Sequence, residues 1–307
     1  MARHGRDGAG NRRRGGGLVV LALIAAVTVT AVIVGPELWH RYSDRVFSSR
    51  CSVTVGDETA SLTAEQTNNA ALIAAVSVER GLPARAATIG IATAIQESSL
   101  RNIDWGDRDS VGLFQQRPSQ GWGEIEEILD PYYSVNKFYD GLIKVSGWQD
   151  LPVTEAAQAV QRSGFPDAYA DHEGESRLWA SALTGNGGRV NCDIGDADPT
   201  TARAFIERVD LDFGPGAYSV EVLDVNSDST VLGLSPGDGE SAQTPQLSAQ
   251  SMREWAVSVS SVQSVIESSY EAAGWLREDG LVEVPTAEGS PVAGYDGAIV
   301  TLRTAPH

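Results

Sequence analysis

The chain has 307 residues, of which 42% are hydrophobic, and this is enough to bury the cores of one or two modest domains. Its formal net charge is -18, and since eight arginines and three acidic residues give the first 50 residues +5, the remainder carries -23. This acidic body excludes nucleic acid as an expected partner, because nucleic-acid binding depends on a basic face.

Residues 18–35 form an uncharged apolar run that follows the basic cluster Arg12–Arg14. The run is near the lower end of the roughly 17 to 25 residues that cross a bilayer as a helix. We therefore expect a cytoplasmic basic tail over 1–17, a single transmembrane helix over 18–35 and a juxtamembrane segment over 36–62. A positive N-terminal flank would leave the bulk of the chain outside the cytoplasm. A cleaved signal peptide followed by secretion is the competing interpretation.

Cys51 and Cys192 are the only cysteines in the chain. In an oxidising compartment, an even pair at the two ends of a domain predicts a disulfide that closes it. The alternative is two unrelated buried thiols. With these limits, we expect one domain over 63–192 and a C-terminal module over 193–307, which contains a flexible linker at 235–248.

Between the cysteines, the apolar spacing predicts helices. Thr63–Gln66 fits a capping box that starts a first helix, and Gly81 fits the end of that helix. Pro83 can open a second helix, which carries Glu97 near its C-terminal end. A helix C-terminus disfavours the negative charge of a carboxylate, so this position helps to keep an acid protonated.

Further helix starts are predicted downstream, whereas the stretch at about 101–122 lacks helical spacing and predicts loops with a small hairpin. These starts lie at Asp130, Thr154 and Pro166.

After Cys192 the pattern changes to that of a small α+β module. Residues 218–223 alternate as a strand, and 230–234 can pair with them across a turn at 226–228. A helix is expected from about residue 249. Short strands are expected at 262–266, 272–276 and 298–302.

The sequence after the predicted second helix carries a family signature. Glu97-Ser98, followed by Gly-Leu-Phe-Gln at 112–115, resembles the E-S … G-L-M-Q signature of lytic transglycosylases and goose-type lysozymes. The Trp-Gly-Asp-Arg sequence at 105–108 is similar to the goose-type loop. The resemblance covers roughly residues 64–190. It implies a lysozyme-like fold: a mainly α (α+β) catalytic domain, to which this chain adds an N-terminal transmembrane helix and a small C-terminal α+β domain.

The resemblance also implies cleavage of the β-1,4 bond between N-acetylmuramic acid and N-acetylglucosamine in peptidoglycan. Glu97 matches the essential acid that protonates the glycosidic oxygen, and Asp107 matches an aspartate that assists water in goose-type enzymes. In lytic transglycosylases a hydroxyl of the muramic acid attacks instead and gives a 1,6-anhydro product. The further residues expected to bind substrate are Ser98, Phe114, Gln115, Gln116, Arg117 and Tyr169.

Several of these residues also have structural interpretations. Asp107 fits an Asx-turn. Either stacking on sugar rings or closure of a core edge would fit Trp105, Phe114 and Trp122. Gln116 and Arg117 fit either recognition of the glycan or its peptide stem, or bracing of the loop.

Two positions depart from the family pattern. Arg117 stands where the goose-type loop has a second aspartate, and residues 159–164 (AVQRSG) stand where the family has A-Y-N-x-G. The alternative function is therefore a non-catalytic cell-wall-binding or scaffold protein with a degenerate lysozyme-like fold. His172 beside Glu173 has no partner at metal-ligand spacing, so we expect neither a metal nor a cofactor. The expected partners are peptidoglycan strands and, through one helix, a membrane.

Overall fold

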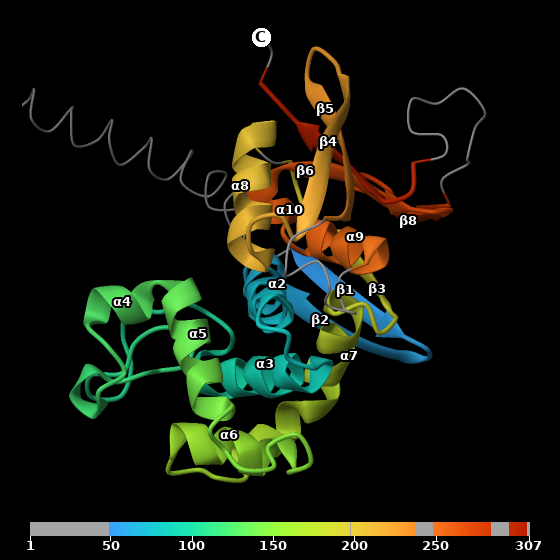
Figure 1. Ribbon diagram of the computed structural model, residues 1–307. Coiled ribbons are helices and arrows are strands. Elements are labelled where there is room, and N and C mark those ends of the chain that lie inside the picture. The colour runs from blue at the N-terminus through green and yellow to red at the C-terminus, as the bar shows by residue number, and fades with distance from the viewer. Residues whose placement is uncertain (1–48, 197, 238–247, 284–294, 306–307) are drawn as a thin grey trace, which may run out of the picture. The chain divides into compact units, whose positions relative to one another are not determined.

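The computed structural model describes residues 49–196, 198–237, 248–283 and 295–305. Of these residues, 43% are helical and 24% lie in strands, which form two antiparallel sheets. The protein is a mixed α+β fold (Figure 1), so the expectation of a mainly α fold is wrong. The strands missed by the sequence pattern are four to six residues long.

The predicted basic tail at 1–17 and transmembrane helix at 18–35 lie outside the described residues. Within the described part of the chain, no helix is long and apolar enough to cross a bilayer. The end of the predicted juxtamembrane segment is instead a pair of antiparallel strands, β1 (Arg50–Val55) and β2 (Glu58–Thr63).

The first sheet has the order β2-β1-β3, with β3 (Arg189–Asp193) contributed from the far end of the predicted catalytic domain. Cys51 on β1 lies directly opposite Cys192 on β3, and the two form the predicted disulfide across 141 positions of sequence. The sheet therefore joins both ends of the helical region. The predicted domain limit after residue 192 falls within β3.

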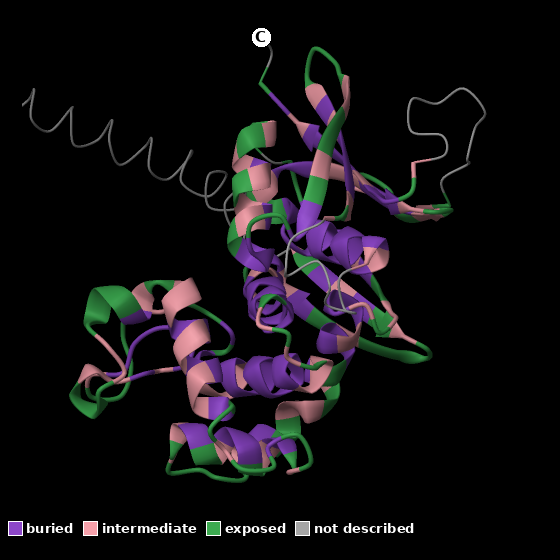
Figure 2. Cartoon of the chain, in the orientation of Figure 1, coloured by how far each residue is buried: buried purple, intermediate pink, exposed green. Residues whose placement is uncertain are grey.

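The helical region is built around one central helix. This helix, α3, packs against α2, α5, α6 and α7, and Figure 2 shows it buried over almost its whole length. Close approach is possible because α3 is rich in alanine and glycine. A Cβ at Gly90 would lie 2.9 Å from Cγ2 of Ile73 and 3.0 Å from the hydroxyl oxygen of Tyr139. The elements of this region are α2 (Ala64–Glu79), α3 (Ala84–Ser98), η1 (Pro118–Gln120), α4 (Ile125–Leu129), α5 (Pro131–Leu142), α6 (Val153–Gln161), η2 (Ala168–His172) and α7 (Glu173–Leu183).

Local sequence signals set most of these helix starts. The capping box predicted at Thr63 and Gln66 is present, and Asp130 caps α5 through the Tyr132 N–H at 2.9 Å. The start predicted at Thr154 is displaced by one residue, because α6 begins at Val153. The helix predicted from Pro166 is replaced first by η2 and then by α7.

The second sheet has the order β4-β5-β9-β6-β7-β8, so the last strand lies between two earlier ones. The hairpin predicted across residues 226–228 is confirmed by the pairing of β4 with β5. The strand predicted at 262–266 is instead α10 followed by the start of β6. The predicted linker lies mostly outside the described residues. The elements are α8 (Ala202–Phe213), β4 (Tyr218–Val225), β5 (Ser229–Pro236), α9 (Ala249–Ser258), α10 (Ser260–Gln263), β6 (Val265–Tyr270), β7 (Ala273–Leu276), β8 (Gly280–Glu283) and β9 (Ala298–Arg303).

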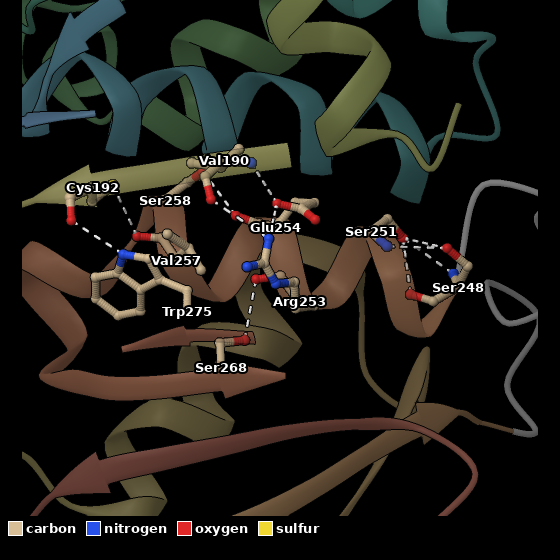
Figure 3. Close-up of polar contacts among 10 residues, drawn as sticks. All are labelled: Val190, Cys192, Ser248, Ser251, Arg253, Glu254, Val257, Ser258, Ser268 and Trp275. Atoms are coloured by element: carbon tan, nitrogen blue, oxygen red, sulfur yellow. Dashed lines mark hydrogen bonds and ion pairs between the residues drawn. The ribbon is translucent and has the colours of Figure 1, made fainter. Parts of the chain in front are cut away.

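Helix α9 connects the second sheet to the first (Figure 3). Its Glu254 accepts a hydrogen bond from the Val190 N–H at 2.7 Å and pairs with Arg253 at 2.6 Å, and both side chains are buried. On the other side, the indole N–H of Trp275 donates to the carbonyl oxygen of Cys192 at 3.1 Å. These bonds fix the C-terminal elements against the disulfide-bearing strand.

A second buried contact lies at Asp212 on α8. Its carboxylate accepts hydrogen bonds from the Tyr132 hydroxyl at 2.6 Å and the Trp255 indole at 2.7 Å, and it pairs with Arg208 at 2.7 Å. A buried charge with this many partners is strongly destabilising to break. Asp212 therefore joins α5, α8 and α9 into one packed unit.

Candidate active site

A groove of about 850 Å³ opens at the C-terminal end of α3. Its walls come from three segments: the end of α3, the loop over 103–122 and the turn after α6. Phe114 and Tyr169 are fully buried and are not among the groove-lining residues. The other predicted site residues line the groove: Glu97, Ser98, Asp107, Gln115, Gln116 and Arg117.

Glu97 is the second-last residue of α3 and is half-buried in the groove wall. Burial raises the pKa of its carboxyl, and hydrogen bonds from Tyr169 and Gln161 offset part of that rise. The helix C-terminus acts in the same direction as burial, since it disfavours a negative charge. The carboxyl therefore stays protonated at a higher pH than an exposed glutamate, as a general acid requires.

Tyr169 reaches this carboxyl from η2. Its hydroxyl donates to Oε1 of Glu97 at 2.6 Å. Burial, with a smaller effect of the Glu97 carboxylate, raises the pKa of Tyr169, so the hydroxyl remains a donor over the ordinary pH range. The hydroxyl thereby fixes the orientation of the acid.

Gln161, the last residue of α6, is a site residue that the sequence pattern did not single out. Its amide donates to the Phe114 carbonyl oxygen at 2.7 Å, and its side chain acts on the Glu97 carboxyl to lower the pKa of that group. It lies in the segment 159–164, which was compared above with the A-Y-N-x-G motif of lytic transglycosylases. That position was the only sequence feature that could have identified Gln161 as a site residue. The structure thus brings this altered segment to the acid.

Ser98, next to the acid, contacts protein backbone. Its buried hydroxyl donates to the carbonyl oxygen of Leu113 at 2.7 Å and accepts from the Arg101 N–H at 3.1 Å. These bonds hold the turn at 112–115 against the end of α3. Ser98 therefore positions the loop that forms the opposite side of the groove.

The two glutamines of the signature have different surroundings. Gln115 has a φ of 46°, and its amide donates to the carbonyl oxygens of Trp105 and Gly112, each at 3.3 Å. Gln116 is buried and donates to the Ser134 carbonyl oxygen at 3.1 Å. The first glutamine thus ties two loop segments together, and the second ties the loop to α5.

Asp107 and Arg117 occupy the positions compared with the goose-type aspartates. The Asp107 side chain is 92% exposed, and its carboxylate lies 3.8 Å from Nε of Arg108. Arg117 pairs with Asp109 at 2.7 Å. Hydrogen bonds from Ser119 and Arg117 hold the pKa of Asp109 well below its usual range. In this structure Arg117 braces the loop, and Asp107 faces solvent at the groove edge.

Large aromatic side chains flank the groove. Trp105 is 69% exposed and Phe165 is 75% exposed, and both line it together with the half-buried Trp122. Phe114 instead stacks on Phe138 with ring centroids 4.5 Å apart, inside the core. The structural interpretation thus fits Phe114, while Phe165 is a groove residue that the sequence pattern did not single out.

His172 lies near the groove, and both of its ring nitrogens contact side chains. Its Nε2 is 3.1 Å from Oε1 of Gln96, and its Nδ1 is 3.2 Å from Oε1 of Glu175. Across the described ranges, no group of three or more His, Cys, Asp and Glu side chains is placed to hold a metal ion. His172 contacts the residue that precedes the acid.

No protein-family model matches this chain, and no curated protein matches its sequence. Function must therefore be argued from the groove and from the residues that line it.

Proposed function

We propose that the protein cleaves the β-1,4 glycosidic bond between N-acetylmuramic acid and N-acetylglucosamine in peptidoglycan, with Glu97 as a single general acid and base. The observation that carries this proposal is the Glu97 carboxyl, which lines a groove, has a raised pKa and accepts a hydrogen bond from Tyr169. A carboxyl group in this state can donate a proton at a pH where an ordinary glutamate has lost it.

The groove walls suit a sugar polymer. Exposed aromatic rings provide apolar faces on which sugar rings can stack, and the amides of Gln96 and Gln115 line the same groove. Most of the chain's acidic charge lies elsewhere: of the described groove-lining residues, only Glu97 and Asp107 are acidic. The groove therefore does not repel a polymer that carries carboxylates.

The proposed reaction begins with transfer of the Glu97 proton to the glycosidic oxygen. The bond from that oxygen to the anomeric carbon of the muramic acid then breaks. A hydroxyl of the same muramic acid attacks that carbon and returns its proton to Glu97, which restores the acid and leaves an anhydro end. Attack by water would give a reducing end instead.

The position of Asp107 favours the internal attack. An inverting hydrolase uses a second carboxylate to activate water, whereas an attached hydroxyl is already positioned by its own sugar. Asp107, the other acidic residue among those described in the groove wall, is almost fully exposed to solvent. A single buried carboxyl therefore suits the anhydro-forming reaction best.

The disulfide supports an extracytoplasmic location, since such bonds persist in oxidising compartments. The bond between Cys51 and Cys192 closes the strand pair at the base of the helical region. Peptidoglycan lies in the same extracytoplasmic space.

The test is digestion of purified peptidoglycan with the full chain, followed by mass analysis of the soluble products. Glu97→Gln should reduce product release by at least about 100-fold, as expected for loss of a general acid. Glu79→Gln is the matched control, because Glu79 also lies at a helix C-terminus but is exposed. We expect anhydro ends from the wild type. Retained binding to the polymer without any product would instead favour the non-catalytic wall-binding protein.

A further inference from the structure

A second groove, of about 800 Å³, adjoins the first. It is lined by residues of α5 and of the end of α6, which contact each other. The two grooves share lining residues, so they adjoin at these positions. The shared residues are Gln120, Trp122, Gln161 and Arg162.

The charged side chains that line the second groove are mostly positive, whereas the chain as a whole is negatively charged. The 307 residues contain only two lysines, Lys137 and Lys144, and both of them line it. Arg162 adds a third cation at the junction of the two grooves. Outside the first 50 residues the chain has a net charge of -23, so three cations that line one groove differ in sign from the chain as a whole.

These cations are not neutralised by neighbouring carboxylates. Asp140, which also lines the groove, pairs with Arg80 at 2.7 Å. Over the residues that the structure describes, no ion pair includes Lys137, Lys144 or Arg162. The three groups therefore remain available to an external anion.

Arg162 is held at the junction by its backbone. It ends α6 in the left-handed region with a φ of 53°, and its N–H donates to the Gln158 carbonyl oxygen at 2.8 Å. Glycine is the residue that adopts this conformation most readily, yet the chain has an arginine here. The preceding residue, Gln161, acts on the Glu97 carboxyl and lowers its pKa, so the backbone of Arg162 lies one residue from a neighbour of the proposed acid.

Part of the groove lining is apolar: Val145, Ala159 and Val160 line it together with Trp122. A ligand with short aliphatic side chains and several carboxylates would match both these side chains and the cations. The peptide stems of peptidoglycan have this chemistry, and the muramic acid carries them as substituents.

We propose that the second groove binds the carboxylates of a peptide stem whose glycan strand occupies the first groove, with Lys137, Lys144 and Arg162 as the binding cations. This inference rests on the proposed function, because the shared lining residues place a substituent of a bound strand next to the cations. It makes the protein selective for peptide-bearing strands.

The test compares two probes that differ only in charge: a disaccharide-pentapeptide with free carboxylates and the same molecule with its carboxylates amidated. Binding is measured to the full chain carrying Glu97→Gln, so that no turnover interferes. We expect the free-carboxylate probe to bind about tenfold more tightly, as two or three partly exposed ion pairs would give. The difference should shrink as the salt concentration rises.

Substitutions test whether the preference comes from the cations of the second groove or from the charge of the whole protein. Replacing both lysines, K137M and K144M together, should reduce the preference to what Arg162 alone provides and leave binding of the amidated probe unchanged. Arg203→Met is the control, because Arg203 is 88% exposed on α8 and lines neither groove. Since the chain has two lysines, reductive methylation with ¹³C gives two lysine signals, and both should shift on binding.

Equal affinity for the two probes, or a preference that the double lysine substitution leaves undiminished, would overturn the inference. The readout does not depend on cleavage. If the wild type releases products but shows no preference, the proposed function stands and this inference fails. If the preference is present but no product ever forms, the binding groove stands and the catalytic proposal fails.

Discussion

The hydroxyl of Tyr169 lies 2.6 Å from Oε1 of Glu97, although the two residues are 72 positions apart in the sequence. The contact joins η2 to the end of α3 at the wall of the groove. The hydrogen bond favours the ionised carboxylate, whereas burial favours the neutral acid, and burial is the larger effect. The state of the acid is thus set by two opposed local influences.

Removal of this hydrogen bond should raise the pKa of Glu97 further. With Tyr169→Phe, an activity that requires protonated Glu97 should therefore persist to a higher pH than in the wild type. The measurement is the pH dependence of product release for both proteins. Tyr270→Phe on β6 is a control outside the groove. An alkaline limb that moves to lower pH in Tyr169→Phe would contradict the assigned role of the hydroxyl.

At neutral pH, ionised Glu97 should lower the free energy of unfolding. The pKa of Glu97 in the folded protein is raised above its ordinary value of 4.5, so the native state binds more protons than the unfolded state between these two pH values. The raised pKa therefore stabilises the folded protein below pH 4.5. This stabilisation is lost as the pH rises through the pKa of the folded state. Glu97→Gln should therefore stabilise the protein at pH 7 more than at pH 4. Denaturant unfolding at both pH values measures this, and a variant less stable at pH 7 would argue against a raised pKa.

Ser98 should matter for structure as well as for the groove. Ser98→Ala removes the donor to the Leu113 carbonyl oxygen and leaves a buried acceptor without it. We expect a loss of about 1–3 kcal/mol in the free energy of unfolding. The exposed Ser146 is the control, and Ser146→Ala should leave stability unchanged. If both variants were equally stable, the hydrogen bond from Ser98 to the turn at 112–115 would not contribute to the free energy of unfolding.

Trp105 and Phe165 should contribute to binding of the polymer. Each ring is exposed at the groove, so truncation to alanine removes an apolar face without opening a core cavity. We expect each substitution to weaken binding by roughly 1 kcal/mol, with little effect on the rate at saturating substrate. Leu211→Ala on α8 removes an exposed apolar side chain elsewhere and serves as control. A fall in the saturated rate with unchanged affinity would point to a catalytic effect instead.

The local parts of the fold could be predicted from the sequence. The capping residues Thr63 and Asp130 fixed two helix starts, and the period of apolar residues in α3 placed Glu97 near its C-terminal end. These features depend on neighbours within one or two turns of helix. The hairpin of β4 and β5 was also predictable, because its pairing crosses a short turn.

The remaining features depend on contacts between distant segments. Strand β1 pairs with β3 across the whole helical region, and β9 lies between β5 and β6. The sequence of β1 or of β9 alone does not show that β3, or β5 and β6, are the strands with which it pairs. The placement of Gln161 and Phe165 at the groove has the same origin, because the turn after α6 is brought there by packing of α6 on α3. Burial of Phe114 against Phe138 likewise requires the complete core.

The most direct test of the central claim is titration of the Glu97 side-chain carboxyl by ¹³C NMR, compared with the pH dependence of peptidoglycan cleavage. Glu97→Gln identifies the signal, which should disappear in that variant. We predict a midpoint for Glu97 above 4.5, and a fall in wild-type activity at the same midpoint as pH rises. A Glu97 carboxyl that titrates at or below 4.5, or cleavage whose pH dependence does not follow it, would contradict the assignment of Glu97 as the acid.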